Sequence, residues 1–115
     1  MSIMRHAVGE RMSQAVVHGD TVYLAGQVAD DTSAGIGGQT EQILNKIDQR
    51  LAEAGTDKSK LLSATIWITD MARFNEMNEV WDAWVSPGNT PARACVEARL
   101  AAPWYQVEIM VIAAR

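Results

Sequence analysis

The stretch QVEIMVIAA, residues 106–114, has the pattern of a β-strand that is apolar on both faces. Its apolar side chains alternate between the two faces, with Val107, Ile109 and Val111 on one and Met110, Ile112 and Ala114 on the other. A strand of this kind is usually buried on both sides. The rest of the chain must therefore supply a cover for each face of the sheet that contains it.

The preceding sequence predicts two helices and four further strands. Apolar residues recur at helical spacing in 39–54 and again after Asp70, where Phe74, Met77, Trp81 and Trp84 form one stripe and Asn78 is expected to face outward. The expected strands are a hairpin within 14–28 around Gly19-Asp20, residues 60–70, and residues 92–100 and 105–114. Residues 29–38 are expected to be a loop that ends where the first helix begins, Gly55 is expected to stop that helix, and residues 1–12 are expected to be a loosely held lead-in.

The expected order is β-β-α-β-α-β-β, an α+β fold with a mixed sheet and two helices on one face. Two helices can cover only one face of a five- or six-stranded sheet. The second apolar face would then be a large exposed patch, and another copy of the chain is the simplest cover. The sequence therefore predicts a homo-oligomer.

Length and composition restrict the class of protein further. The chain has 115 residues, which fits a single domain over 1–115, and 48% hydrophobic and 21% charged residues are ordinary for a globular protein. A net charge of −4 argues against a nucleic-acid partner. One cysteine and two distant histidines, His6 and His18, predict no metal site and no cofactor. With no apolar segment long enough for a membrane span or signal peptide, the expected location is cytoplasmic, with no membrane partner.

The stretch PARACVEARL, residues 91–100, alternates between small or aliphatic and polar side chains. Arg93 and Cys95 share one face, and the other face is expected to be core. We expect this strand to form a hairpin with the last one. If paired residue numbers sum to an odd value near 205, Glu108 shares the face of Arg93, whereas an even sum separates them; matching the apolar faces favours the odd sum. Apolar neighbours would raise the pKa of Glu108 if no cation were near.

PARACVEARL followed by QVEIMVIAA resembles the closing signature of the Rid/YjgF family of reactive-intermediate deaminases. The likeness extends through VYLAGQVADD (22–31) and TIWITDMARFNEMNEVWDAWV (65–85), and covers about residues 11–114. The resemblance implies a YjgF/chorismate-mutase-like fold, assembled as a homotrimer whose sheets form a central barrel with a cleft at each subunit boundary. It also implies hydrolysis of 2-imino acids and their enamine tautomers to 2-oxo acids and ammonia.

The resemblance assigns roles to individual residues. Arg93 would bind the carboxylate of a small-molecule substrate, because a guanidinium pairs with a carboxylate through two parallel hydrogen bonds. Glu108 would position or deprotonate the attacking water, or pass a proton to the leaving ammonia. The other substrate-binding positions are Cys95, Ala25, Gly26, Met12 and Trp104, with Cys95 lining the pocket rather than acting as a nucleophile.

Alternatives to these roles stay open at this level. Arg93 could instead form an ion pair with Glu97 or Glu108, and Glu108 could only neutralise Arg93 or Arg99. Many deaminases of the family have Ser-Gly-Gln where this chain has Ala25-Gly26-Gln27, and a Tyr where it has Met12. A non-catalytic module that binds small carboxylates is therefore the second hypothesis. A ribonuclease is the third, and the acidic balance and the lack of a histidine pair argue against it.

Overall fold

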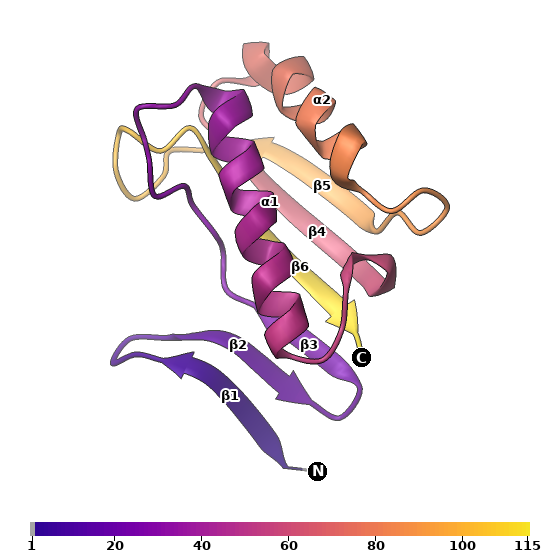
Figure 1. Cartoon of the computed structure of the whole chain (residues 1–115). Coiled ribbons are helices and arrows are strands. Elements are labelled where there is room, and N and C mark those ends of the chain that lie inside the picture. Colours follow the sequence, from indigo (N-terminus) through magenta and orange to yellow (C-terminus); the bar gives the residue numbers. More distant parts are fainter. Residues whose placement is uncertain (1) are drawn as a thin grey trace.

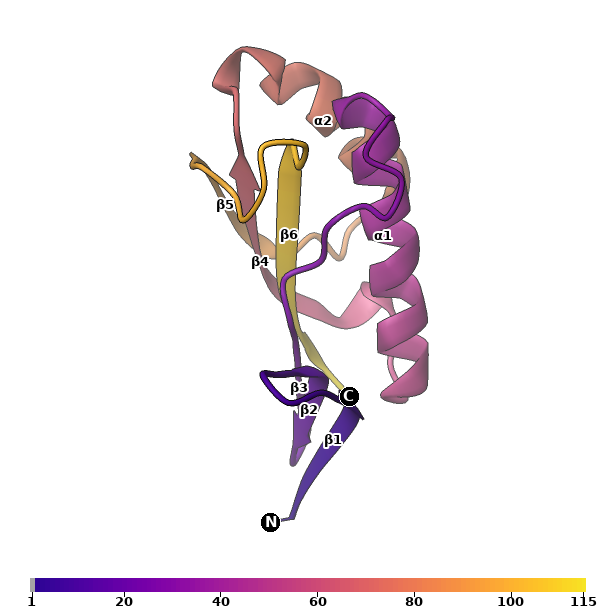
Figure 2. The same ribbon diagram turned by 90° about the vertical axis from the view of Figure 1, so that its left-hand side faces the viewer.

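A computed structural model describes residues 2–115 as a six-stranded mixed sheet with two helices packed on one face (Figure 1). The strands are β1 (Ile3–Val8), β2 (Ser13–His18), β3 (Thr21–Leu24), β4 (Leu61–Ile68), β5 (Ala92–Glu97) and β6 (Val107–Ala114), in the spatial order β1-β2-β3-β6-β4-β5. The helices are α1 (Ile36–Glu53) and α2 (Phe74–Trp84), with short 3-10 helices at Lys58–Lys60 and Met71–Arg73. Seen edge-on, both helices lie on the same side of the sheet, as predicted (Figure 2).

The strand that is apolar on both faces, β6, lies inside the sheet between β3 and β4. Val107, Ile109 and Val111 are fully buried beneath the helices. The alternate residues, which include Met110 and Ile112, are only half-buried on the opposite face. The prediction of a central strand with one face covered by helices is confirmed.

Helix α1 buries the predicted stripe of Ile43, Ile47 and Leu51 against the sheet. The helix begins at Ile36, three residues earlier than predicted, and the fully buried Ile36 side chain anchors its first turn. It ends where Gly55 adopts a φ of +82°, a left-handed conformation that glycine adopts without strain. Gly55 therefore acts as the predicted stop.

The prediction of a loose lead-in over residues 1–12 is wrong for its central part. Residues 3–8 form β1, which pairs antiparallel with β2 from Ile3 opposite His18 to Val8 opposite Ser13. This edge strand lies beyond the area that the helices cover (Figure 1), and Ile3, Met4 and Val8 are exposed. Because neither face is buried within the chain, the sequence carries no clear alternation there.

The expected hairpin between the last two strands is also wrong. Strand β5 pairs in parallel with β4 at the edge of the sheet, and β4 separates it from β6. Helix α2 forms the crossover between β4 and β5, which is the usual connection between parallel neighbours. Residues 98–106 then return the chain past β4 to the middle of the sheet. No register between β5 and β6 exists, so neither the odd nor the even sum applies.

The placement of β5 reverses its two faces. Cys95 lies beside Ile66 of β4 and packs against the core, whereas Val96 lies beside Trp67 and is 47% exposed. Ala92 and Ala94 share the open face with Val96, so the face expected to be core is the uncovered one.

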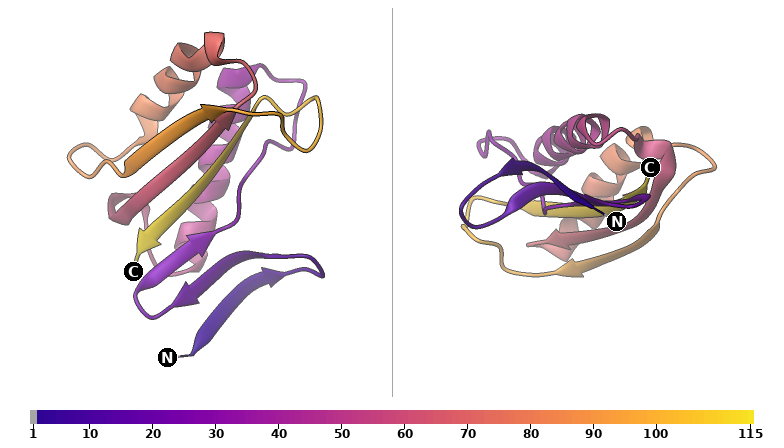
Figure 3. Two further views of the ribbon diagram at one scale, coloured as in Figure 1. Left: turned by 180° about the vertical axis from the view of Figure 1, so that it is seen from behind. Right: turned by 90° about the horizontal axis from the view of Figure 1, so that it is seen from below.

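No helix of residues 2–115 covers this second face of the sheet (Figure 3). Its apolar side chains come from neighbouring strands: Tyr23 from β3, Met110 and Ile112 from β6, Trp67 from β4 and Val96 from β5. We refer to it below as the open face. Its apolar character fits the expectation that a second copy of the chain covers it.

Candidate functional site

The carboxylate of Glu108 lies on the open face, directly over the backbone of Gly26. Tyr23 pairs with Ile112 and Gln27 pairs with Ile109, so the β3 side contains one extra residue and bulges at Ala25 and Gly26. A side chain at Gly26 would overlap Oε2 of Glu108 and stand 3.0 Å from its Cδ. Only glycine at this position leaves the carboxylate its place.

Glu108 is half-buried, and its carboxylate makes neither a hydrogen bond nor an ion pair within residues 2–115. Its direct cross-strand neighbour is Trp67 of β4. Partial burial disfavours the charged form and raises the pKa of Glu108 above the usual 4.5. The alternative that Glu108 neutralises Arg93 or Arg99 is not seen within the chain.

Hydrogen bonds among Gln14, Ala25 and Gln27 hold the bulge beside Glu108 in place. The Ala25 amide donates to the carbonyl of Gln14 at 2.9 Å. The Gln27 side chain donates to Gln14 Oε1 at 3.0 Å and to the Ala25 carbonyl at 2.9 Å. Met12, two residues before Gln14, is 55% exposed beyond the same end of these strands. The fold thus gathers Ala25, Gly26 and Glu108, with Met12 at their margin.

Arg93 lies on the other face of the sheet, toward α2. Its Nη1 donates to Oδ1 of Asn78 at 2.8 Å, and its guanidinium carbon lies 5.2 Å from the ring centre of Trp81 and 5.8 Å from that of Phe74. No ion pair to Arg93 occurs among the described residues, and the carboxylate of Glu97 instead accepts from the Met71 amide at 2.9 Å. Arg93 is therefore not engaged by Glu97 or Glu108.

The expectation that Arg93 and Glu108 share a face is wrong. Arg93 lies beside Ala64 of β4, whose side chain is buried toward the helices, whereas Glu108 lies beside Trp67, which faces the open side. Two strand spacings, about 10 Å, and the thickness of the sheet separate them. The two side chains cannot contact one substrate within a single chain.

Cys95 lies on the same face as Arg93 and is half-buried against the core. Burial raises the pKa of its thiol, and the opposing effect of the nearby Arg93 is smaller. The thiol is therefore protonated at neutral pH, which is consistent with a wall position and not with a nucleophile.

Trp104 is 57% exposed in the connection between β5 and β6, with its ring edge-on to Tyr105. Its backbone is held by a hydrogen bond from the side chain of Gln39, a fully buried residue in the first turn of α1. The Gln39 amide donates to the Trp104 carbonyl at 3.1 Å, and its oxygen accepts from the Gln106 amide at 3.0 Å. This clamp fixes the segment that leads into β6 and Glu108.

The sequence pattern missed Asn78, which was expected to face outward. Phe74, Asn78 and Trp81 are spaced i, i+4 and i+7, so they form a single stripe on α2 that faces Arg93. The stripe was a usable signal, because a polar residue between two aromatic ones on one helix face is well placed to meet a cation from the neighbouring strand.

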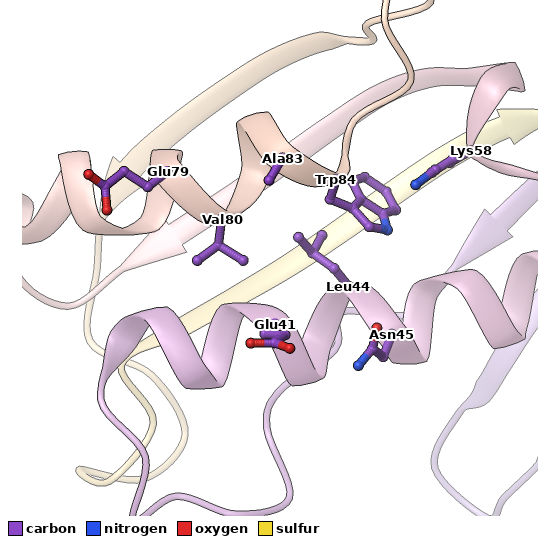
Figure 4. Close-up of a pocket in the computed structure, with 8 residues that line it drawn as sticks. All are labelled: Glu41, Leu44, Asn45, Lys58, Glu79, Val80, Ala83 and Trp84. Carbon is purple, nitrogen blue, oxygen red and sulfur yellow. The ribbon is translucent and has the colours of Figure 1, made fainter.

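A groove of about 430 Å³ lies between α1 and α2 and contains none of the expected site residues (Figure 4). The indole of Trp84 forms part of its wall, donates to Asp48 at 3.0 Å and lies 5.4 Å from the ring of Trp81. Lys58 stands 5.2 Å from the same Trp84 ring. The aromatic pair therefore lies between two cations, Lys58 at one end and Arg93 at the other.

Two further expectations concern metal binding and membrane insertion. Across residues 2–115, no three histidine, cysteine, aspartate or glutamate side chains gather in a way that could hold a metal ion. Within the same span, neither helix has the length and apolar character needed to cross a membrane.

The fold and these side chains define a small α+β domain with an aromatic-stacked arginine near one sheet edge and an unpaired carboxylate on an open face. The chain matches, over residues 4–115, the family model described as endoribonuclease L-PSP. It therefore belongs to this family, the YjgF/Rid family, as the sequence resemblance indicated.

Individual relatives agree with this assignment. A RutC family protein of Haemophilus ducreyi is 46% identical over 97% of this chain and 96% of its own length. A 2-iminobutanoate/2-iminopropanoate deaminase of Rattus norvegicus is 30% identical over 88% of this chain and 77% of its own. The crystal structure of a YjgF family member from Neisseria meningitidis has a TM-score of 0.95 and 45% identity, and covers 100% of this chain and 96% of that one.

Proposed function

We propose that this protein hydrolyses small 2-imino acids and their enamine tautomers to 2-oxo acids and ammonia. The observation that carries the proposal is Glu108, a half-buried carboxylate over Gly26 with a raised pKa and no hydrogen-bond or ion-pair partner among residues 2–115. A group of this kind is suited to proton transfer, because its pKa is moved toward the working pH. Relatives named as imine deaminases give the substrate class.

The reaction needs one anchoring group and one proton-transfer group. Arg93 binds the substrate carboxylate through two parallel hydrogen bonds. Glu108 accepts a proton from a water molecule while the water oxygen attacks the C=N carbon of the substrate. Glu108 then returns a proton to the nitrogen. Glu108 then takes the hydroxyl proton of the resulting carbinolamine and passes a proton to its amino group, so that the C–N bond breaks, the C=O bond forms and ammonia leaves. Backbone groups near Cys95 orient the imine nitrogen.

The separation of Arg93 and Glu108 requires that the site be shared between two chains. We infer that the Arg93 end of β5 from one chain meets the open face of another, where Glu108 and Gly26 lie. A homotrimer whose open faces form a central barrel would provide three such clefts and would bury the apolar face. Trp104 and Met12 are proposed to line the margins of the cleft.

The second candidate is a carboxylate-binding module of the same fold without turnover. The observation that favours it is the side-chain chemistry near Glu108. Ala25 in the bulge offers no hydroxyl, and Met12 presents a thioether instead of a polar group. Arg93 would retain affinity for a 2-oxo acid in such a module.

The two candidates separate in one assay. We generate 2-imino acids in situ with an amino-acid oxidase and follow their disappearance with and without the protein. We expect acceleration that Glu108→Gln removes and that Arg93→Ala weakens through KM by about 10- to 100-fold, the range expected for lost hydrogen bonds to a charged group. The charge-matched controls Glu76→Gln and Arg73→Ala should behave as wild type. If the protein accelerates the loss of none of the small, aliphatic and aromatic imino acids, the deaminase proposal is wrong and the carboxylate-binding module remains as the candidate.

The description of the family model also names an endoribonuclease. His6 and His18 do not form a catalytic pair in β1 and β2, because His6 lies opposite Ala15 on one face and His18 lies opposite Ile3 on the other. Cleavage of RNA that persists through rigorous purification would support this third candidate. The cytoplasmic location stays a prediction.

A further inference from the structure

Three side chains of α2 surround the guanidinium of Arg93. Trp81 and Phe74 provide aromatic surfaces 5.2 Å and 5.8 Å from the guanidinium carbon, and Asn78 accepts a hydrogen bond of 2.8 Å from Nη1. Trp81 is itself fixed, since it is 4% exposed and its ring lies against that of Trp84. The stripe therefore offers a rigid support to a side chain that would otherwise sample many rotamers.

The donors of Arg93 show what this support leaves free. A guanidinium carries five N–H groups, and Asn78 engages only one of those on Nη1. The edge formed by Nε and Nη2 has no partner within residues 2–115, and it is one of the edges that bind a carboxylate through two parallel hydrogen bonds. Asn78 is neutral, so it fixes the guanidinium without reducing its charge.

We propose that Asn78 is a positioning residue that holds the Arg93 guanidinium on Trp81 and leaves its Nε–Nη2 edge free for the substrate carboxylate. This inference rests on the proposed role of Arg93 as the carboxylate anchor. An acceptor that is both neutral and amide-shaped is essential to it. A carboxylate in its place would pair with Arg93 and compete with the substrate.

The decisive comparison is between Asn78→Asp and Asn78→Ala. A merely structural role predicts that the nearly isosteric Asn78→Asp is the milder change. The positioning role predicts the reverse order. The dissociation constant for pyruvate at pH 7, measured by titration calorimetry, rises roughly 3- to 10-fold for Asn78→Ala and by more than about 10-fold for Asn78→Asp. KM for the imino acid follows in parallel, while kcat stays within about threefold.

Asn75→Asp is the matched control, because it adds the same charge to an exposed position of the same helix. It should leave pyruvate affinity unchanged. Wild-type affinity in Asn78→Asp, or an equal loss in Asn75→Asp, would overturn the inference. Arg93→Ala separates this result from failure of the proposed function. If Arg93→Ala leaves pyruvate binding intact, the anchor itself is wrong; if it abolishes binding while both Asn78 variants bind normally, only the positioning role fails.

Discussion

Substitution of Gly26 by alanine tests whether the position of the Glu108 carboxylate determines activity. A Cβ at residue 26 would overlap Oε2 of Glu108 and stand 3.0 Å from Cδ and 3.3 Å from Cγ. Ordinary contact begins at 3.4 Å, so the carboxylate must retreat by about 1 Å. Gly26 does not have a positive φ, so alanine itself is compatible with the backbone.

The expected effect falls on catalysis more than on stability. A displacement of about 1 Å in a reacting group costs on the order of 100-fold in rate, equivalent to about 2.7 kcal/mol of barrier height. The carboxylate is the flexible end of a side chain at an open face, so the free energy of unfolding should fall by less than about 1.5 kcal/mol. We expect kcat/KM for imine hydrolysis to fall about 100-fold in Gly26→Ala, with a folded protein in thermal unfolding.

A double-mutant cycle in thermal unfolding shows whether the added Cβ acts through Glu108. In a Glu108→Ala background the obstacle is gone, so the loss of unfolding free energy caused by Gly26→Ala should disappear. Gly37→Ala is the matched control, because its added Cβ on α1 would meet Val80 of α2 at 3.8 Å, an ordinary van der Waals contact. That control should keep full activity and gain about 0.5–1 kcal/mol of stability. Wild-type activity in Gly26→Ala, or an equal loss of unfolding free energy in both backgrounds, would refute the reasoning.

Three further predictions concern stability and assembly. Because the pKa of folded Glu108 is raised, its ionisation destabilises the fold as pH rises from about 4.5 through the folded pKa; Glu108→Gln should therefore stabilise the protein more at pH 7 than at pH 4 in urea titrations. Val96→Glu places a charge on the apolar open face and should lower the molecular mass of the proposed homo-oligomer in light scattering, whereas Ala83→Glu on the helix side should not. Gln39→Leu removes the hydrogen bonds of its side-chain amide to the Gln106 amide and to the carbonyl groups of Thr32, Ala34 and Trp104, and should cost about 2–4 kcal/mol of unfolding free energy.

Each of these expectations has a clear contrary result. A stabilisation by Glu108→Gln that is equal at both pH values would show that desolvation of the carboxylate is not its cause. An unchanged molecular mass for Val96→Glu would remove the open face from the subunit contact. Unfolding of Gln39→Leu at the wild-type denaturant midpoint would show that the buried amide is not a structural clamp.

The features that followed from the sequence are those set by local periodicity. The helical stripes of α1 and α2 each specify a buried face without reference to any partner. Apolar side chains on both faces of β6 likewise predicted a central strand. Because two helices can cover only one face of the sheet, the same pattern also predicted that the second face is left open within the chain. The family signature selected Arg93 and Glu108, because it identifies residues independently of how their strands are paired.

The relation between those two residues depended on strand order, which local periodicity does not encode. The α2 crossover makes β5 a parallel neighbour of β4 instead of a hairpin partner of β6. The face that carries Arg93 therefore points toward the helices, opposite to the face expected from a β5–β6 hairpin. Arg93 consequently faces Asn78 and Trp81, and Glu108 faces the open side.

The sequence by itself therefore determined both helices, five of the six strands, the covered face and the family, and it predicted a partner chain for the open face. Only the tertiary structure decided which side chains meet. The carboxylate of Glu108 depends on a bulge at Gly26, and the guanidinium of Arg93 depends on a stripe of α2 that lies 15 residues earlier at Asn78. Both contacts join segments distant in sequence, and their geometry is set by the packing of β3, β6 and α2 rather than by the pattern of any one of them.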